Sequence, residues 1–223
     1  CLNFNYTISR GMIMITMKKF TLALAVSLLF AFSVSAASLE SVCEGLAKHP
    51  HTKGNFTQTK TLKANNRSIK SSGNFIFGLD GIMWNTTKPF PSTLAVSKTQ
   101  ITQTAADGSK SVIKAEDNEI FGSVANTLTA VFSNDLSLLK SNFNVSFKDI
   151  GNGKWSINLV PKDSTITAVM KSLTLEGTEK ASDTSLDTII MTEASENTIT
   201  YNFTDQTYPK ELTADEKAFF VAE

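Results

Sequence analysis

The chain has 223 residues, and its 21 Lys and Arg residues balance 21 Asp and Glu residues, so the formal net charge is zero. This balance gives no electrostatic sign of nucleic-acid binding, which depends on clustered Lys and Arg, and we expect no nucleic-acid partner. The hydrophobic share is that of an ordinary globular protein, and the length allows one large β domain or two small domains.

Residues 17–36 have the three-part pattern of a secretory signal peptide. A charged start at Met17-Lys18-Lys19 precedes the apolar run from Phe20 to Phe32, and small residues follow. We expect cleavage after Ala36; the run is short for a transmembrane helix, so an uncleaved anchor is the less favoured alternative. Residues 1–16 are expected to be upstream sequence included by a wrong start assignment.

Residues 37–223 are expected to form a single domain, because they contain no internal repeat, no low-complexity segment and no shift in composition. Loss of Arg10, Lys18 and Lys19 with the leader leaves this part slightly acidic. Cys43 is then the only cysteine, which excludes an internal disulfide bond. We interpret Cys43 as a small apolar residue of a helix.

The first predicted element is an amphipathic helix that Ser38 can cap and that Pro50 must end. Its apolar residues recur at intervals of three and four and form one stripe: Leu39, Val42, Cys43, Leu46 and Ala47. We expect this stripe to pack on a sheet.

From Asn55 onward the apolar period changes to two, which is typical of strands. We predict strands at residues 54–62, 69–78, 81–86, 92–97, 99–104 and 110–115. Turn residues such as Asn65-Asn66 and Asp107-Gly108 separate them. Connections this short favour antiparallel pairing.

Within this series, Phe75 and Phe77 point to one face of a strand while Ile76 points to the other. Asp80-Gly81 can supply the turn that follows. The returning segment Ile82-Met83-Trp84 is apolar without a break, so we expect it to bury both faces.

The middle of the chain changes period again. Two neighbouring rows of apolar side chains predict an amphipathic helix over residues 118–132, and a short second helix is expected at 136–140. Alternation then returns on both sides of Gly151-Asn152-Gly153, which predicts a hairpin. The alternating apolar residues of this hairpin are Phe143, Val145, Phe147, Trp155, Ile157 and Leu159.

The last third continues as strands and ends in a helix. Alternating apolar residues occur near Leu173, Ile189 and Tyr201, with a turn at Glu196-Asn197, and a closing helix is expected at 213–221. The elements together predict an α+β half-barrel: a curled antiparallel sheet of about 10–11 strands with helices at the start, middle and end. A closed lipocalin-like barrel is the alternative, and it accounts less well for the central helices.

One string of residues resembles a known family. It runs from Phe56-x-Gln58 through Gly73-x-Phe75-x-Phe77 to Trp84 and Pro89, and continues to Leu159-Val160-Pro161-Lys162 and the final Phe-Phe. In its order and spacing this string is similar to the outer-membrane lipoprotein carrier (LolA) family.

The resemblance implies an unclosed β-barrel with helices packed on its concave face as a lid. It also implies a monomeric periplasmic carrier of an acylated lipoprotein or glycolipid cargo, with an inner-membrane exporter, an outer-membrane acceptor and no cofactor. In the best-known members an arginine just after the Gly-x-Phe-like strand holds the lid shut. This chain has Gly78-Leu79-Asp80 there, and Lys88, the nearest cation, lacks the planar fork of arginine.

Catalysis is not expected, because the residues that usually carry it are few. His49 and His51 flank Pro50 at a helix end and are interpreted as a solvated loop; we expect no metal site and no cofactor there. Gly151-Asn152-Gly153-Lys154 is too short for a phosphate-binding loop. A lipoprotein-sensing module similar to RseB and a secreted hydrolase are the alternatives to a carrier.

Alternating apolar residues give one face of the predicted sheet an oily, aromatic surface. Such residues can fill a core or line a pocket for apolar ligands, and the family resemblance favours the pocket. The expected cavity residues are Phe56, Phe75, Phe77, Met83, Trp84, Leu94, Val96, Phe121, Val124, Leu128, Phe147, Trp155, Ile157, Tyr201 and Phe203.

Overall fold

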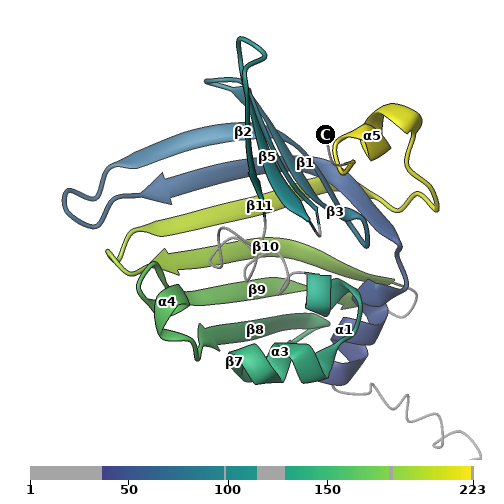
Figure 1. Ribbon diagram of the computed structural model, residues 1–223. Coiled ribbons are helices and arrows are strands. Elements are labelled where there is room, and N and C mark those ends of the chain that lie inside the picture. The colour runs from purple at the N-terminus through teal and green to yellow at the C-terminus, as the bar shows by residue number, and fades with distance from the viewer. Residues whose placement is uncertain (1–36, 98, 115–128, 181–182, 222–223) are drawn as a thin grey trace, which may run out of the picture. The chain divides into compact units, whose positions relative to one another are not determined.

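The computed structural model describes residues 37–97, 99–114, 129–180 and 183–221 (Figure 1). The predictions for residues 1–36, and those for Phe121, Val124 and Leu128, lie outside this part of the chain. Its strands are β1 (His51–Thr61), β2 (Ser68–Gly78), β3 (Gly81–Lys88), β4 (Ser92–Ser97), β5 (Gln100–Ala105), β6 (Lys110–Lys114), β7 (Phe143–Gly151), β8 (Lys154–Pro161), β9 (Met170–Lys180), β10 (Asp183–Glu193) and β11 (Thr198–Thr207). Its helices include α1 (Leu39–Ala47), α3 (Leu136–Asn142), α4 (Ser164–Thr167) and α5 (Ala214–Ala218).

The described strands form one antiparallel sheet in the order β6-β5-β4-β3-β2-β1-β11-β10-β9-β8-β7. Strands β1 and β11, far apart in the sequence, pair at the centre of the sheet, and all other neighbours are joined by hairpins or short connections. In the described part of the chain, β6 and β7 are edges and do not pair with each other. Figure 1 shows the sheet curling, so that β3 and β5 are steeply inclined to β9 and β10. The predicted α+β unclosed barrel is confirmed, and the closed-barrel alternative is wrong.

The helices follow the local signals in the sequence. Ser38 caps α1 in a reciprocal capping box with Ser41, and the α1 stripe packs against β10. Asp135 caps α3, which lies beside β7 (Figure 1). The closing helix was predicted over residues 213–221 and is shorter in the structure, where α5 extends over Ala214–Ala218. The four-residue α4 was not predicted.

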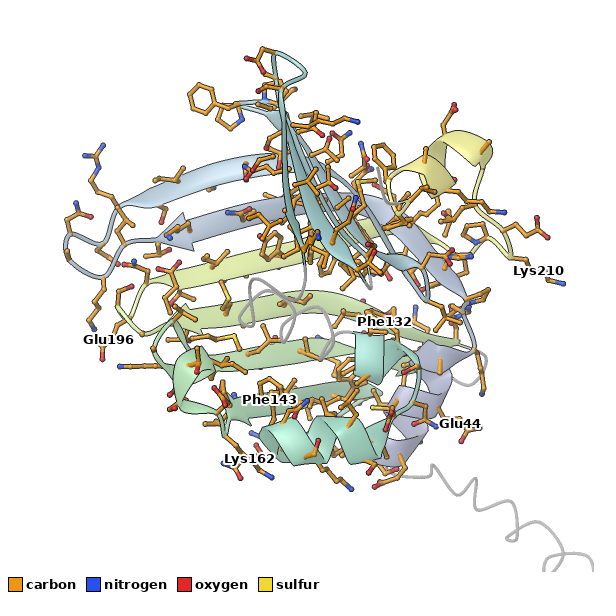
Figure 2. The ribbon with its side chains drawn as sticks, in the orientation of Figure 1. Glu44, Phe132, Phe143, Lys162, Glu196 and Lys210 are labelled. Atoms are coloured by element: carbon orange, nitrogen blue, oxygen red, sulfur yellow. The ribbon has the colours of Figure 1, made fainter. Side chains whose placement is uncertain are left out.

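Most of the core lies on one side of the sheet, which we call the inner face. Side chains from α1, from the helical turn at 129–132 and from α3 meet the sheet there, among them Val42, Val131 and Leu139, all at most 1% exposed. Figure 2 shows Phe132 and Phe143 on this side, close to α3. The helices therefore cover the same face that the alternating aromatic residues line.

A smaller core lies on the opposite, outer face. Ile76, Met83 and Ala95 stand side by side on β2, β3 and β4, and Leu212 and Phe220 pack over them. The prediction that β3 buries both faces is confirmed. Placing Met83 with Trp84 on the inner face was wrong, since Met83 lies one residue from Trp84 and adjacent residues of a strand point to opposite faces.

The first strand begins earlier than predicted, at His51. His51 is buried, and His49 stacks on Tyr208 with ring centroids 3.8 Å apart. The His49 Nε2 atom also lies 2.6 Å from the Asp183 carboxylate. The interpretation as a solvated loop was wrong for His51, because the chain enters the sheet directly after Pro50, whereas His49 does lie in the loop between α1 and β1 and is partly exposed. In the described ranges, no helix has the length and hydrophobicity needed to cross a bilayer.

Candidate functional site

The inner face holds a connected network of aromatic rings contributed by four strands. Phe77 is at its centre, with ring centroids 4.5 Å from Phe75, 5.3 Å from Phe203 and 5.4 Å from Trp84. Tyr201 extends the network, with its ring centroid 5.9 Å from that of Trp84. Edge-on and tilted pairs at these distances are favourable beyond the area that they bury.

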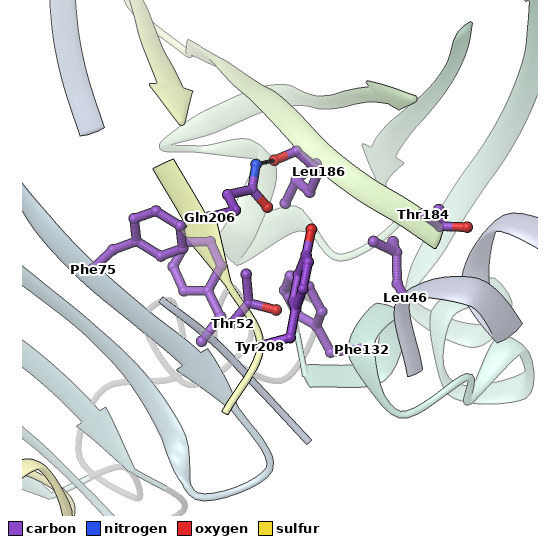
Figure 3. A pocket seen from close by; sticks show the side chains of 9 residues that line it. Leu46, Thr52, Phe75, Phe132, Thr184, Leu186, Gln206 and Tyr208 are labelled. Carbon is purple, nitrogen blue, oxygen red and sulfur yellow. Dashed lines mark hydrogen bonds between the residues drawn. The ribbon is translucent and has the colours of Figure 1, made fainter. Parts of the chain in front are cut away.

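The part of this network beneath α1 is closed. A depression lined by Leu46, Phe75, Phe132 and Tyr208, among others, contains no space that a water molecule could occupy (Figure 3). Gln206 donates its side-chain N–H to the Leu186 carbonyl at 2.8 Å beside it. The expectation of vacant space fails at this position, because the protein's own side chains fill it.

The pairing register of the strands shows which inner-face residues lie opposite each other on neighbouring strands. Phe147 lies opposite Ile157, which is followed across the sheet by Leu175, Ile189 and Tyr201. With strands about 4.8 Å apart, this row of five spans about 19 Å. We call it the inner-face row. Its middle members are buried, whereas Phe147 and Tyr201 at its ends are partly exposed.

Partly exposed apolar side chains continue beside the inner-face row. Val145 and Met191 occupy the next positions along β7 and β10, and Trp84 reaches the network from β3. Among the described residues, the buried Nε1 atom of Trp84 has no hydrogen-bond partner. The described side chains that line this part of the sheet are mostly apolar, an arrangement that suits an apolar ligand.

The structure brings together most of the cavity residues that the sequence predicted. Phe56, Phe75, Phe77, Trp84, Phe147, Trp155, Ile157, Tyr201 and Phe203 all belong to the inner-face cluster or pack against it. Leu94 and Val96 lie opposite Trp84 and Ile82 and so share that face, and Met83 does not. Sequence reasoning missed Leu175 and Ile189 as site residues, although both have the alternation that would have placed them in the row.

Burial raises the pKa of two groups on the inner side, Cys43 and Tyr201. Burial, with a smaller effect of Glu40, raises the pKa of the Cys43 thiol from 9.0 to about 11. Burial alone raises the pKa of the Tyr201 hydroxyl from 10.0 to about 12. In the residues that the structure describes, no three His, Cys, Asp or Glu side chains converge as a metal site would require.

We expect the Cys43 thiol and the Tyr201 hydroxyl to make the protein less stable at alkaline pH. Each group binds its proton more tightly in the folded chain than in the unfolded chain. Its contribution to the free energy of unfolding is therefore complete below the pKa that it has in the unfolded chain, and it is lost as the pH rises through the pKa that it has in the folded chain. Between pH 9 and 12 we expect the free energy of unfolding to fall by about 3 kcal/mol for each group, at 1.36 kcal/mol per pKa unit. Urea unfolding at pH 8 and pH 11.5 measures this. Tyr201→Phe should show the smaller loss, and equal losses in both proteins would contradict the assignment.

The fold and the site define a class: an unclosed antiparallel sheet whose helix-covered inner face is lined with aromatic and aliphatic side chains. The chain belongs to the LolA family, because the profile of the outer membrane lipoprotein carrier protein LolA matches residues 48–219. No curated protein sequence matches the chain.

The solved structures that match this chain include the following two. One is a LolA superfamily protein from Nitrosomonas europaea, with 12% identity, a TM-score of 0.46, and coverage of 81% of this chain and 100% of that one. The other is a DUF1329 family protein from Desulfovibrio piger, with 8% identity, a TM-score of 0.49, and coverage of 82% and 94%.

Proposed function

We propose that this protein is a non-enzymatic periplasmic carrier that shields the acyl chains of a lipoprotein or another acylated lipid. The observation that carries the proposal is the inner-face row, an apolar strip about 19 Å long with partly exposed aromatic ends. Membership of the lipoprotein-carrier family supports the same function. The signal-peptide pattern of residues 17–36 supports export to the periplasm.

The energetic need for such a carrier is large. Transferring an acyl chain of about fifteen methylenes out of water is worth roughly 12 kcal/mol, at about 0.8 kcal/mol for each methylene. An unprotected lipid therefore does not cross an aqueous compartment at a useful rate. Contact with even part of the inner face would lower this barrier.

The cargo must also be released, so its site has to open and close at moderate cost. The middle of the inner-face row is covered, and the side chains of Val131 and Leu139 are part of the core above the sheet. We propose that the turn at 129–132 and α3 separate from the sheet and that the acyl chain replaces their contacts. Cargo can then shift the equilibrium between the closed and open states only by the difference between its binding free energies for those two states.

The partners follow from the same proposal. A carrier between two membranes requires an inner-membrane exporter that loads it and an outer-membrane acceptor that unloads it. The protein would act as a monomer, because one copy supplies the whole inner-face row.

Co-purification with lipid tests the proposal. The protein is isolated without detergent and analysed by native mass spectrometry, and a fluorescent fatty acid is titrated with and without a competing triacylated peptide. We expect an adduct of acyl-lipid mass, and displacement of the probe by the peptide. Lack of any adduct together with lack of probe binding would contradict a carrier function.

A further inference from the structure

The outer face carries a groove that the acyl-binding proposal does not use. It lies beside α5, over β1, β2 and β3, and has a volume of about 330 Å³. Its walls combine charged, amide and aromatic side chains, among them Lys53, Asn55, Asn74, Asn85, Asp205, Glu216 and Phe219. The groove is distinct from the inner-face row because Asn55, Asn74 and Asn85 alternate with the inner-face residues of their strands.

Three asparagines form a row across this groove. Asn55 on β1 lies opposite Asn74 on β2, which lies opposite Asn85 on β3, so the amides recur at about the 4.8 Å strand spacing. The Asn85 Nδ2 atom donates to Asn74 Oδ1 at 3.4 Å. Each amide carries two N–H donors and one carbonyl acceptor, so the row presents both kinds of group to a ligand.

A backbone irregularity adds a carboxylate to this row. The pairing of β1 with β11 shifts register between Lys53 and Asn55, and Asp205 in the bulge has a positive φ of 53°. Bulges re-aim side chains, and a non-glycine residue in the left-handed region is uncommon. Here the bulge brings the Asp205 carboxylate to Asn55, whose Nδ2 atom donates to it at 2.9 Å.

Charge restricts what the groove can bind. Lys53 is ion-paired with Glu216, so with Asp205 the groove has one excess negative charge, which disfavours phosphate and other anions. The backbone groups of β1, β2 and β3 are paired within the sheet, so a peptide cannot add as a further strand. Phe219, 39% exposed, and Met83 supply an apolar wall.

We infer that this groove is a second binding site, whose ligand is a neutral, multiply hydroxylated molecule such as a segment of glycan. Hydroxyl groups both donate and accept, which matches alternating amides and a carboxylate. The C–H face of a sugar ring is apolar and can lie on the phenyl ring of Phe219. The site is independent of acyl-chain binding, so either proposal can fail without the other.

Titration of the ¹⁵N-labelled protein with maltotriose and with N,N′,N″-triacetylchitotriose tests the site. We expect at least one sugar to shift the side-chain amide signals of Asn55, Asn74 and Asn85 and the backbone signals of α5. Inorganic phosphate should leave them unchanged. Asn55→Ala and Asn85→Ala should each weaken binding by about tenfold, the effect of losing one or two hydrogen bonds.

Asn144→Ala is the matched control, because Asn144 is an exposed asparagine of β7, far from the groove in the order of strands. Circular dichroism establishes that each variant is folded before its affinity is compared. The inference is wrong if neither sugar shifts the three amides, if phosphate shifts them more strongly, or if a folded Asn85→Ala variant binds as well as the unchanged protein.

Discussion

Replacing Phe77 with alanine is expected to lower the free energy of unfolding by about 3–5 kcal/mol, the range for truncating a buried phenylalanine. Phe77 is 2% exposed, and its ring lies within 5.5 Å, centroid to centroid, of those of Phe75, Phe132, Phe203 and Trp84. Alanine would leave a cavity that touches the sheet and the helical turn at 129–132 together. Equilibrium unfolding in urea measures the loss.

Phe90→Ala is the control for this prediction, because Phe90 is 82% exposed and the same atoms are removed. We expect Phe90→Ala to change stability by less than about 0.5 kcal/mol. If Phe77→Ala were as mild as Phe90→Ala, the aromatic network would not be the centre of the core.

The position of Phe77 also decides which substitutions can test function. A glutamate there would bury an unpaired carboxylate in the tightest part of the network, so it would unfold the chain regardless of any ligand. Function is better tested at the partly exposed ends of the inner-face row. Exposure of this kind is not visible in the sequence, where Phe77 and Phe147 have the same alternating pattern.

Sequence patterns could predict most of the sheet because their signals are local. Glycine and asparagine turns fixed the hairpins, and period-two alternation fixed which residues share a face, as for Phe75 and Phe77. The same alternation predicts that Met83 and Trp84 face opposite sides of the sheet. This was missed because the run Ile82-Met83-Trp84 is apolar without a break. The packing of Leu212 and Phe220, from the distant C-terminal segment, confirms that Met83 faces the outer side.

The parts that could not be predicted depend on contacts between residues far apart in the sequence. The pairing of β1 with β11 brings Asn55 to Asp205, and that of His49 with Asp183 joins the end of α1 to β10. Pairing partners also set where a strand begins and ends, so β1 begins at His51 rather than at the predicted Gly54. The outer-face groove could not be foreseen for the same reason.

Placing a carboxylate at Phe147 is expected to weaken acyl-lipid binding by more than 100-fold while the protein stays folded. Phe147 is a partly exposed end of the inner-face row, so glutamate there can reach water in the free protein. A bound acyl chain would cover that carboxylate without giving it a partner, which costs several kcal/mol. A loss of about 2.8 kcal/mol already corresponds to 100-fold in the dissociation constant.

Ser146→Glu is the matched control, because Ser146 is the preceding residue of β7 and its side chain points to the opposite face. It adds the same charge to the same strand, so any effect of net charge or of strand stability appears in both variants. Fluorescent fatty-acid titration, with thermal unfolding as the test of folding, separates them. Equal affinities of folded Phe147→Glu and Ser146→Glu would place the acyl chain somewhere other than the inner-face row, since only one of the two carboxylates faces it.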